Sequence, residues 1–485
     1  MLPSQRARAE TRRVWTAFLV GVAVTVALTA LLTWGAMAPR YLLYRDFVTV
    51  PDPVLNAAAF GAAGAPRSVP LDLVTALAAM VAPSWLIQKI LMVAPLLFAG
   101  SGTSFLLRHR GVAATIVASV LAVWNPYVAE RLLLGQSPTL LGYAMIPWLL
   151  AAVRSERSRG FRIALVTLAA LPALLTPVGG VMALLTVIVA AASLPTGRRV
   201  VDAALLGLPV LGLCLPWILS GLSDPTRGAM PAGATAFGVA TDSPGGVIGS
   251  VLTLGGVWAP SARLDSRATW LALVAEIVLV VVAVYSWWVV RRDPQWRRTA
   301  DLGLAAYGLV VVVVLLVGGP ALPLWRSLQQ VPGVAMFRDT HRLLGFAAMS
   351  LALLCGVATF HLCSALARWR GPRRWLPTVA GVVTLVGDRT PVRSRPRGST
   401  QCRAAPGDLP DAVGPGGRSG EPLAGWRLGP GLALATLPAD VVGRASALSG
   451  PSATCPGRRG RQRPRPARDP RRPGHVGRRR GPAAG

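Results

Sequence analysis

The sequence predicts an all-α fold: a polytopic transmembrane helix bundle with about eleven spans, a cytoplasmic N-terminus and a disordered C-terminal tail. Three observations lead to this prediction. Only 14% of the 485 residues are charged, whereas about a quarter are charged in a typical soluble chain. Apolar runs that approach the ~20 residues needed to cross a bilayer recur between residues 15 and 387. Arginines gather at alternate junctions between these runs.

The predicted membrane domain covers residues 15–387. Pro172 and Pro177 interrupt one apolar stretch, which could form two short helices or one kinked arrangement. Residues 71–82 are too short to span a bilayer and are expected to form a re-entrant or interfacial helix. The expected spans are 15–37, 84–107, 111–127, 138–153, 161–175, 178–194, 200–219, 269–290, 301–317, 343–367 and 375–387.

The arginines set the predicted orientation. Twenty of them lie at one set of alternate junctions, which the positive-inside rule assigns to the cytoplasm, and ten lie at the opposite set. Residues 1–14 therefore form a cytoplasmic N-terminal segment. The first apolar run is too long for a signal peptide and is expected to remain as a helix. The predicted outer loops are residues 38–83, 125–137, 220–268 and 318–342.

The net charge of +30 does not indicate a nucleic-acid partner. Lys89 is the only lysine, and the other 49 basic residues are arginines, a bias that fits a GC-rich bacterial genome. Nineteen of these arginines follow residue 387, and most of the others flank apolar runs. A phosphate-binding groove would instead combine arginines with aromatic residues on one folded surface. The expected partner is the lipid bilayer, and the expected location is the bacterial plasma membrane.

Residues 388–485 differ in composition from the rest of the chain. Of these 98 residues, 64 are Arg, Gly, Pro or Ala, and none of their apolar runs is long enough to span. Such a segment cannot bury enough apolar surface to fold, so disorder is expected, without site residues. The change falls within the apolar run 375–387. The segment is either a native basic tail or the product of a frameshift in GC-rich DNA.

Familiar soluble-enzyme motifs are absent from the sequence. It has no GxxxxGK[ST], no HExxH, and no GxSxG at a strand-to-helix turn. The five cysteines form no CxxC pair, and the four histidines are far apart, so the sequence predicts no zinc site. Candidate chemistry therefore lies in the long outer loops, where polar residues gather.

The first outer loop contains the candidate catalytic residue Asp46. This carboxylate follows the first helix closely and is flanked by Arg45 and aromatic residues. It could act as a general base on an acceptor hydroxyl, or help to bind a divalent cation beside a phosphate. Arg40 and Arg45 could bind that phosphate. The alternative is an Asp–Arg pair that only orders the loop.

Two other outer segments place charge at the membrane boundary, where uncompensated charge is costly. Asn125-Pro126 signals the end of a helix, and two charged residues follow closely. The second segment leads directly into a span. The candidate binding residues from these segments are Glu130, Arg131, Arg338, Asp339, His341 and Arg342; for the last four, positioning of the helix is the alternative. Within the spans, Lys89 and Glu276 are functional candidates, or long side chains that extend to the interface.

These segments resemble those of polytopic membrane proteins of actinobacteria, which are similar in layout to the GT-C superfamily of membrane glycosyltransferases. The residues that resemble them are N-P-Y-V-A-E-R-L-L-L-G-Q-S-P-T-L-L-G-Y-A-M-I-P-W and P-G-V-A-M-F-R-D-T-H-R-L-L. The resemblance implies a polyprenyl-phosphate-sugar donor, Asp46 at the acidic catalytic position, and Arg338 or Arg342 near the donor phosphate. The chain departs from that superfamily in lacking a DxD or Asp-Glu pair in its first outer loop.

Two other classes of function remain open. A transporter or flippase for a lipid-linked or amphipathic substrate would have broken helices and polar sites near the midplane. The sequence has Pro and Gly breaks, but it shows no clear internal repeat and few midplane charges. The third class is a membrane protein without catalytic activity.

Overall fold

The computed structural model describes residues 3–61, 69–194, 199–222, 231–292, 297–370, 426–428 and 432–438. Within these ranges helices are the main secondary structure, as the sequence predicts, with long loops between some of them. Seven segments are helices that are long and apolar enough to cross a membrane. These seven segments are Ala7–Ala36, Ser84–Arg110, Val112–Leu133, Arg199–Leu222, Trp270–Val290, Ala300–Gly318 and Thr340–Ala367.

The helix boundaries follow the predicted spans closely, but the number of candidate spans is seven rather than eleven. Three expected spans form helices α6, α7 and α8, of 14, 12 and 16 residues, which are shorter than the ~20 residues of a typical span. The expected span 375–387 lies outside the described residues. Six of the seven candidate spans are built on α1 (Pro3–Thr33), α3 (Ser84–Leu107), α9 (Arg199–Leu222), α12 (Trp270–Val290), α13 (Arg297–Gly318) and α15 (Leu344–Arg370). The seventh combines α4 (Val112–Val123) with the helix that follows it.

Local sequence signals explain several helix ends. The Asn125 side chain accepts a hydrogen bond from the backbone N–H of Val128 (3.0 Å), and Pro126 occupies the first turn of α5. The same arrangement of a cap followed by proline starts α8 at Thr176 and Pro177. The prolines therefore separate two helices at residues 161–194, rather than kinking one. The shorter helices are α5 (Pro126–Leu133), α6 (Leu140–Val153), α7 (Arg159–Ala170) and α8 (Pro177–Ala192).

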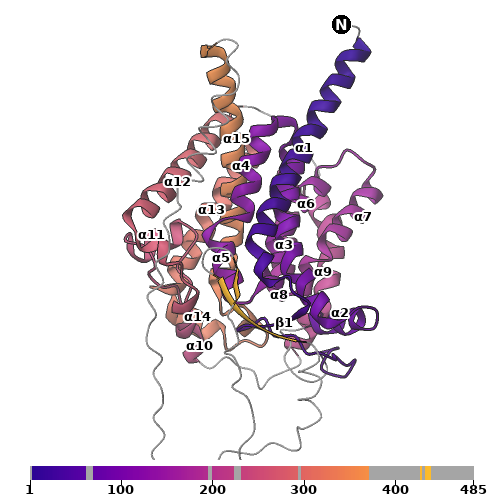
Figure 1. Ribbon diagram of the computed structural model, residues 1–485, viewed down its shortest axis with the longest axis vertical. Coiled ribbons are helices and arrows are strands. Elements are labelled where there is room, and N and C mark those ends of the chain that lie inside the picture. Colours follow the sequence, from indigo (N-terminus) through magenta and orange to yellow (C-terminus); the bar gives the residue numbers. More distant parts are fainter. Residues whose placement is uncertain are drawn as a thin grey trace, which may run out of the picture. The chain divides into compact units, whose positions relative to one another are not determined.

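Shorter elements occupy the loops that were predicted to lie outside. Residues 71–82 do contain a short helix, α2 (Leu71–Ala79). In Figure 1, β1, α2, α10 and α14 lie at the end of the bundle opposite the N-terminus. The remaining elements are α10 (Pro231–Ala236), α11 (Gly246–Leu252), α14 (Leu322–Leu328), β1 (Arg40–Leu43), β2 (Trp426–Leu428) and β3 (Leu432–Pro438).

The strands are the only described part of the predicted C-terminal tail. β3 pairs antiparallel with β1, with Arg40 opposite Pro438, and β2 pairs antiparallel with β3. The other residues of 388–485 lie outside the described part of the chain.

Three apolar clusters form the core of the described residues, and the two larger ones join the long helices. One joins α3, α4 and α6 to α15 through residues such as Leu96, Leu121 and Ala348. The other joins α6, α7, α8 and α9 through residues such as Leu149 and Val187. Helices α12 and α13 pack against α15, whereas α8 packs against α6 and α9. Helices α6 and α15 contact each other, so α8, which packs on α6, and α13, which packs on α15, are linked through this pair.

Candidate functional site

The first outer loop folds back on the turn that follows α5. The backbone N–H of Asp46 donates to the carbonyl of Leu134 (3.4 Å). Gly135 has a φ of +76°, and a Cβ there would lie 2.6 Å from the Phe47 nitrogen and 2.7 Å from the Tyr44 carbonyl oxygen. Only glycine fits this backbone approach without displacement. The approach places Asp46 next to the residue that follows Gly135.

That neighbour, Gln136, connects Asp46 to the protein interior. The Gln136 Nε2 donates to Asp46 Oδ2 (2.8 Å), and Arg131 Nη1 donates to Gln136 Oε1 (2.7 Å). Because one end of the amide accepts and the other donates, its orientation is fixed. Asp46 itself is exposed, whereas Gln136 and Arg131 are buried. The Asp46 carboxylate is therefore exposed to solvent, and its orientation is fixed by a hydrogen bond from the buried Gln136 side chain.

Arg131 and Asp339 form a buried ion pair at the centre of this network. Two hydrogen bonds join them: Arg131 Nη1 donates to Asp339 Oδ2 (2.6 Å), and Arg131 Nη2 donates to Asp339 Oδ1 (3.3 Å). Arg342 Nε also donates to Asp339 Oδ2 (3.2 Å), and Trp258 Nε1 donates to the same oxygen (3.4 Å). Burial alone would raise the pKa of Asp339, but the Arg131 and Arg342 guanidinium groups lower it well below its usual range.

His341 and Glu130 extend the network on the far side of Arg131. An arginine can only donate hydrogen bonds, so His341 Nδ1 accepts from Arg131 Nη2. The imidazole proton is then assigned to Nε2, which donates to the Gly255 carbonyl (3.0 Å) and lies 3.3 Å from Glu130 Oε2. The side chains of His341 and Glu130 are fully buried. His341 is therefore a neutral hydrogen-bonding bridge.

A second ionic group, centred on Arg267, lies next to this bridge. Arg267 pairs with Asp242 (2.9 Å) and with Glu276, the acidic residue of α12. A Cβ on Gly255 would touch the Arg267 guanidinium, so this backbone separates Arg267 from His341. Burial would raise the pKa of Asp242, but Arg267 lowers it to about 2. The salt bridge of Glu276 accounts for the charge that the sequence places within a span.

The predicted site residues fall into two sets. The network contains six of them: Asp46, Glu130, Arg131, Asp339, His341 and Arg342. Three lie apart from its hydrogen bonds. Arg40 begins β1, the Arg45 guanidinium lies 5.3 Å from the Tyr44 ring centroid, and Arg338 lies 4.4 Å from that of Phe237. The burial of Arg131, Glu130 and His341 favours positioning over direct contact with a substrate.

Sequence reasoning missed several members of the site. The polar residues that it did not select are Gln136 and Arg267, which are buried, and Asp242 and Trp258, which are partly buried. Gln136 is five residues from Arg131 in an otherwise apolar stretch, which is a usable signal. The other three lie in the long loop 220–268, where no helical or strand periodicity indicates which polar side chains face inward.

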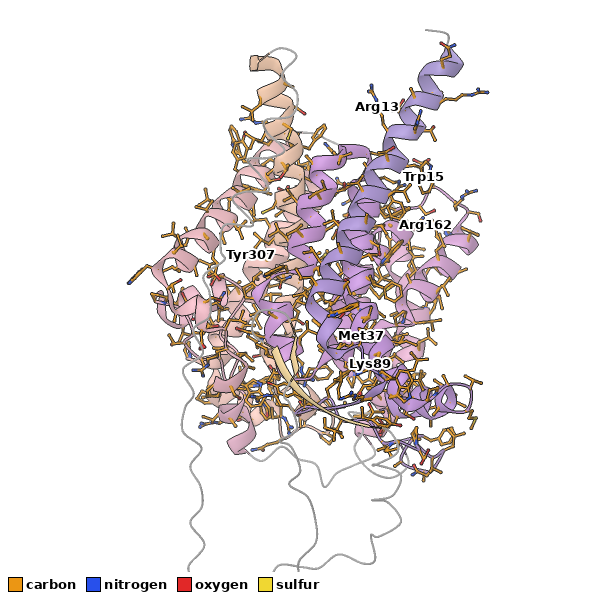
Figure 2. All side chains as sticks on the ribbon, viewed as in Figure 1. Arg13, Trp15, Met37, Lys89, Arg162 and Tyr307 are labelled. Carbon is orange, nitrogen blue, oxygen red and sulfur yellow. The ribbon has the colours of Figure 1, made fainter. Side chains whose placement is uncertain are left out.

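One other buried polar group, the Lys89 ammonium, lies apart from the network. The Lys89 ammonium on α3 is buried and has no hydrogen-bond partner among the described residues. Figure 2 shows Lys89 toward the end of the bundle opposite Arg13. Within the described ranges, no three His, Cys, Asp or Glu side chains lie close enough to hold a metal ion.

Comparison with family models, curated proteins and solved structures found no match to this chain. What is shown is an integral membrane protein with several apolar helices. The candidate site is therefore defined by the chain's own geometry.

Proposed function

We propose that the protein is a membrane glycosyltransferase of the GT-C type. It would transfer a sugar from a polyprenyl-phosphate donor to a cell-envelope acceptor at the outer face of the plasma membrane. The observation that supports this proposal is the exposed Asp46 carboxylate, which is oriented by Gln136 and, through it, by the buried Arg131–Asp339 pair. Rigid support of this kind is what a catalytic group requires.

In the proposed reaction, Asp46 acts as the general base. The acceptor hydroxyl oxygen attacks the anomeric carbon of the donor sugar and forms the new glycosidic bond. The bond between that carbon and the phosphate oxygen breaks, and polyprenyl phosphate leaves with the bonding electrons. The acceptor proton passes to an oxygen of the Asp46 carboxylate. Gln136 occupies Oδ2, so Oδ1 is the oxygen that we assign to the proton.

Arginines near the same end supply positive charge for the donor phosphate. Arg45 is exposed beside Asp46, and the Arg342 side chain retains 25% of its exposure although its Nε binds Asp339. Arginine forks suit phosphate oxygens. Arg40 and Arg338 are further candidates for this role. Glu130, Arg131, Asp339 and His341 are positioning residues in this proposal, because they are buried.

The test is transfer from radiolabelled polyprenyl-phosphate mannose and polyprenyl-phosphate glucose by the full chain in membranes whose outer face is accessible. Asp46→Asn should lower the rate about 10²–10⁴-fold, as expected for loss of a general base. The control is Asp52→Asn, because Asp52 is an exposed carboxylate of the same loop. Equal rates for the two variants, or movement of intact donor across the membrane without transfer, would contradict the proposal.

A further inference from the structure

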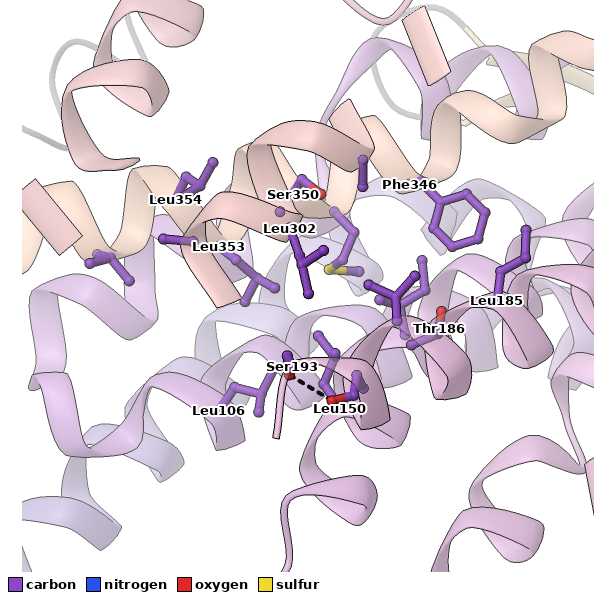
Figure 3. Close-up of a pocket in the computed structure, with 18 of the residues that line it drawn as sticks. Leu106, Leu150, Leu185, Thr186, Ser193, Leu302, Phe346, Ser350, Leu353 and Leu354 are labelled. Atoms are coloured by element: carbon purple, nitrogen blue, oxygen red, sulfur yellow. Dashed lines mark hydrogen bonds between the residues drawn. The ribbon is translucent and has the colours of Figure 1, made fainter. Parts of the chain in front are cut away.

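A large apolar cavity lies among the apolar helices of the bundle, and its lining contains none of the residues of the ionic network. Its volume is about 320 Å³, which is at the lower end of the ~300–1,000 Å³ typical of small-ligand sites. Figure 3 shows side chains of α6, α8, α13 and α15 around it. Leu150, Leu185, Leu309, Phe346 and Leu353 are among the residues that line it. The cavity is the space between α8 and α13, and α6 and α15 also contribute to its lining.

The chemistry of the lining excludes water as a stable occupant. Almost all of the lining side chains are hydrocarbon. Three hydroxyls are among the lining side chains, those of Thr186, Ser193 and Ser350. Thr186 donates its hydroxyl to the Met182 carbonyl (2.7 Å), and Ser193 donates to the Ala190 carbonyl (2.6 Å), so two of the three hydroxyl protons are already used within α8 and its C-terminal end. A buried water needs two to four polar partners. A hydrocarbon chain needs none, and the surrounding bilayer can supply it.

One end of the cavity has a positive charge. Arg154 is the one charged residue in the lining and lies at the C-terminal end of α6. Arg162 Nε donates to the Val153 carbonyl (3.2 Å), which places a second guanidinium at the same turn. From Phe346 to Val357 the cavity follows α15 for eleven residues, or roughly 16 Å at ~1.5 Å per residue. An apolar channel of this length with a cation at one end complements an anionic amphiphile.

We propose that this cavity binds one acyl chain of an anionic phospholipid, with the lipid phosphate against Arg154. The alternation of arginines assigns the α6–α7 turn to the cytoplasmic side, so the lipid comes from the cytoplasmic leaflet. This leaflet is the one that carries anionic lipid. The site does not depend on the proposed transfer reaction, which is located at the opposite end of the bundle.

Two glycines of α13 give a matched test. Gly303 lines the cavity, and a Cβ there would meet no atom within 4 Å. Gly308 lies on the same helix with the same open space but does not line the cavity. Gly303→Phe should therefore fill the cavity, and Gly308→Phe should add the same side chain elsewhere. Arg154→Gln removes the charge at the cavity, and Arg157→Gln removes an exposed charge from the same turn.

The experiment uses the full chain, purified in detergent after reconstitution with equal amounts of palmitoyl-oleoyl phosphatidylglycerol and palmitoyl-oleoyl phosphatidylcholine. Native mass spectrometry then measures the lipid that each protein retains. The unaltered protein and Gly308→Phe should retain phosphatidylglycerol preferentially, and Gly303→Phe should retain neither lipid. Arg154→Gln should reduce the preference about fivefold, since one arginine near a membrane surface contributes about that factor.

Arg157→Gln should leave this preference unchanged. The proposal fails if the unaltered protein retains no lipid, or if Gly303→Phe and Gly308→Phe retain equal amounts. It also fails if Arg154→Gln keeps the full preference. This last comparison decides the question even if the phenylalanine variants do not fold. None of these readings depends on glycosyl transfer, so the two proposals can fail separately.

Discussion

At the scale of single residues, the buried arginines determine how this protein holds charge. Arg131 has no exposed side-chain surface, and Arg267 has 2%. Each faces carboxylates at hydrogen-bond distance, so the cost of desolvating the charges is offset by direct pairing. Lys89 differs, since its ammonium is buried with no hydrogen-bond partner in the part of the chain that the structure describes. For the ion pairs of Arg131 and Arg267, removal of either partner would leave an uncompensated buried charge and lower the stability of the fold.

The first prediction concerns the central pair. Asp339→Asn keeps the shape of the side chain but leaves the Arg131 charge without its carboxylate, which should lower the free energy of unfolding by about 3–5 kcal/mol. Thermal unfolding of the detergent-solubilised protein measures the loss. The control is Arg297→Gln, which breaks an exposed pair with Asp301 (3.9 Å) and should change stability by at most about 1 kcal/mol. Similar effects of the two variants would show that the buried pair is not structurally important.

The second prediction is a pH dependence from Asp242, whose pKa Arg267 lowers from 3.8 to about 2. A carboxyl group with a lowered pKa in the folded protein stabilises it above the unfolded-state pKa, and this contribution is lost as pH falls. The contribution, about 2 kcal/mol, should be complete above pH 5 and decline from pH 4 toward pH 2. Unfolding of the protein and of Asp242→Asn, compared at each pH, measures it. A stability difference that does not change over this range would contradict the assignment.

The sequence identified part of the site because charge at a membrane boundary is costly and therefore conspicuous. Arg131 and Asp339 were selected on this basis, and Asp46 because it follows the first helix closely; the structure places all three in one network. Gln136 and Asp242 were missed because uncharged or loop residues have no such signal. The contacts between distant loops, which decide which polar groups meet, have no local sequence pattern.

At the scale of elements, composition predicted where helices form better than whether they cross the membrane. The predicted span 84–107 coincides with α3, and the Asn125-Pro126 signal separates α4 from α5. Helices α6, α7 and α8 also lie where expected, but proline and glycine shorten them. High hydropathy indicates that a segment is apolar, but it does not distinguish a short helix buried in the protein from a helix that crosses the membrane.

The third prediction concerns the contact between the first outer loop and the turn after α5. Gly135→Ala places a Cβ against backbone atoms of Tyr44 and Phe47, and it also strains a positive φ. The cost should be about 2–4 kcal/mol, of which the φ accounts for about 1 kcal/mol. Gly333→Ala is the control, since its φ is +83° in the left-handed region and the atom nearest its Cβ would lie 3.7 Å away, an ordinary van der Waals distance. Equal losses in unfolding measurements would mean that this loop does not dock on the turn.

At the scale of the whole described bundle, the ionic network joins segments that are far apart in the chain. Asp46 comes from the first outer loop, Arg131 from α5, Gly255 from the loop after α11, and Asp339 from the segment before α15. These loops can meet only if they lie on one side of the membrane. The alternation of arginines predicts that this side is the outer face.

The last prediction tests this topology and the crossing of the short helices. A reporter fused after Arg159 should be cytoplasmic, and one fused within residues 225–240 should be outside, because arginines concentrate at the first position. These two fusions alone cannot show whether α7 and α8 cross, since a re-entrant pair would leave both results unchanged. A third fusion, after Leu175, separates the cases.

The third fusion should be outside. A Cβ on Gly180, near the start of α8, would lie 3.2 Å from the Trp217 ring, and Trp217 is near the end of α9 that leads to the outer loop. The turn between α7 and α8 therefore reaches the outer half of the bundle. Alkaline phosphatase, active only outside, and green fluorescent protein, fluorescent only inside, give opposite signals at each position. A cytoplasmic signal after Leu175 would make α7 and α8 a re-entrant pair, and a shared location of the first two fusions would remove Asp46 from the outer face.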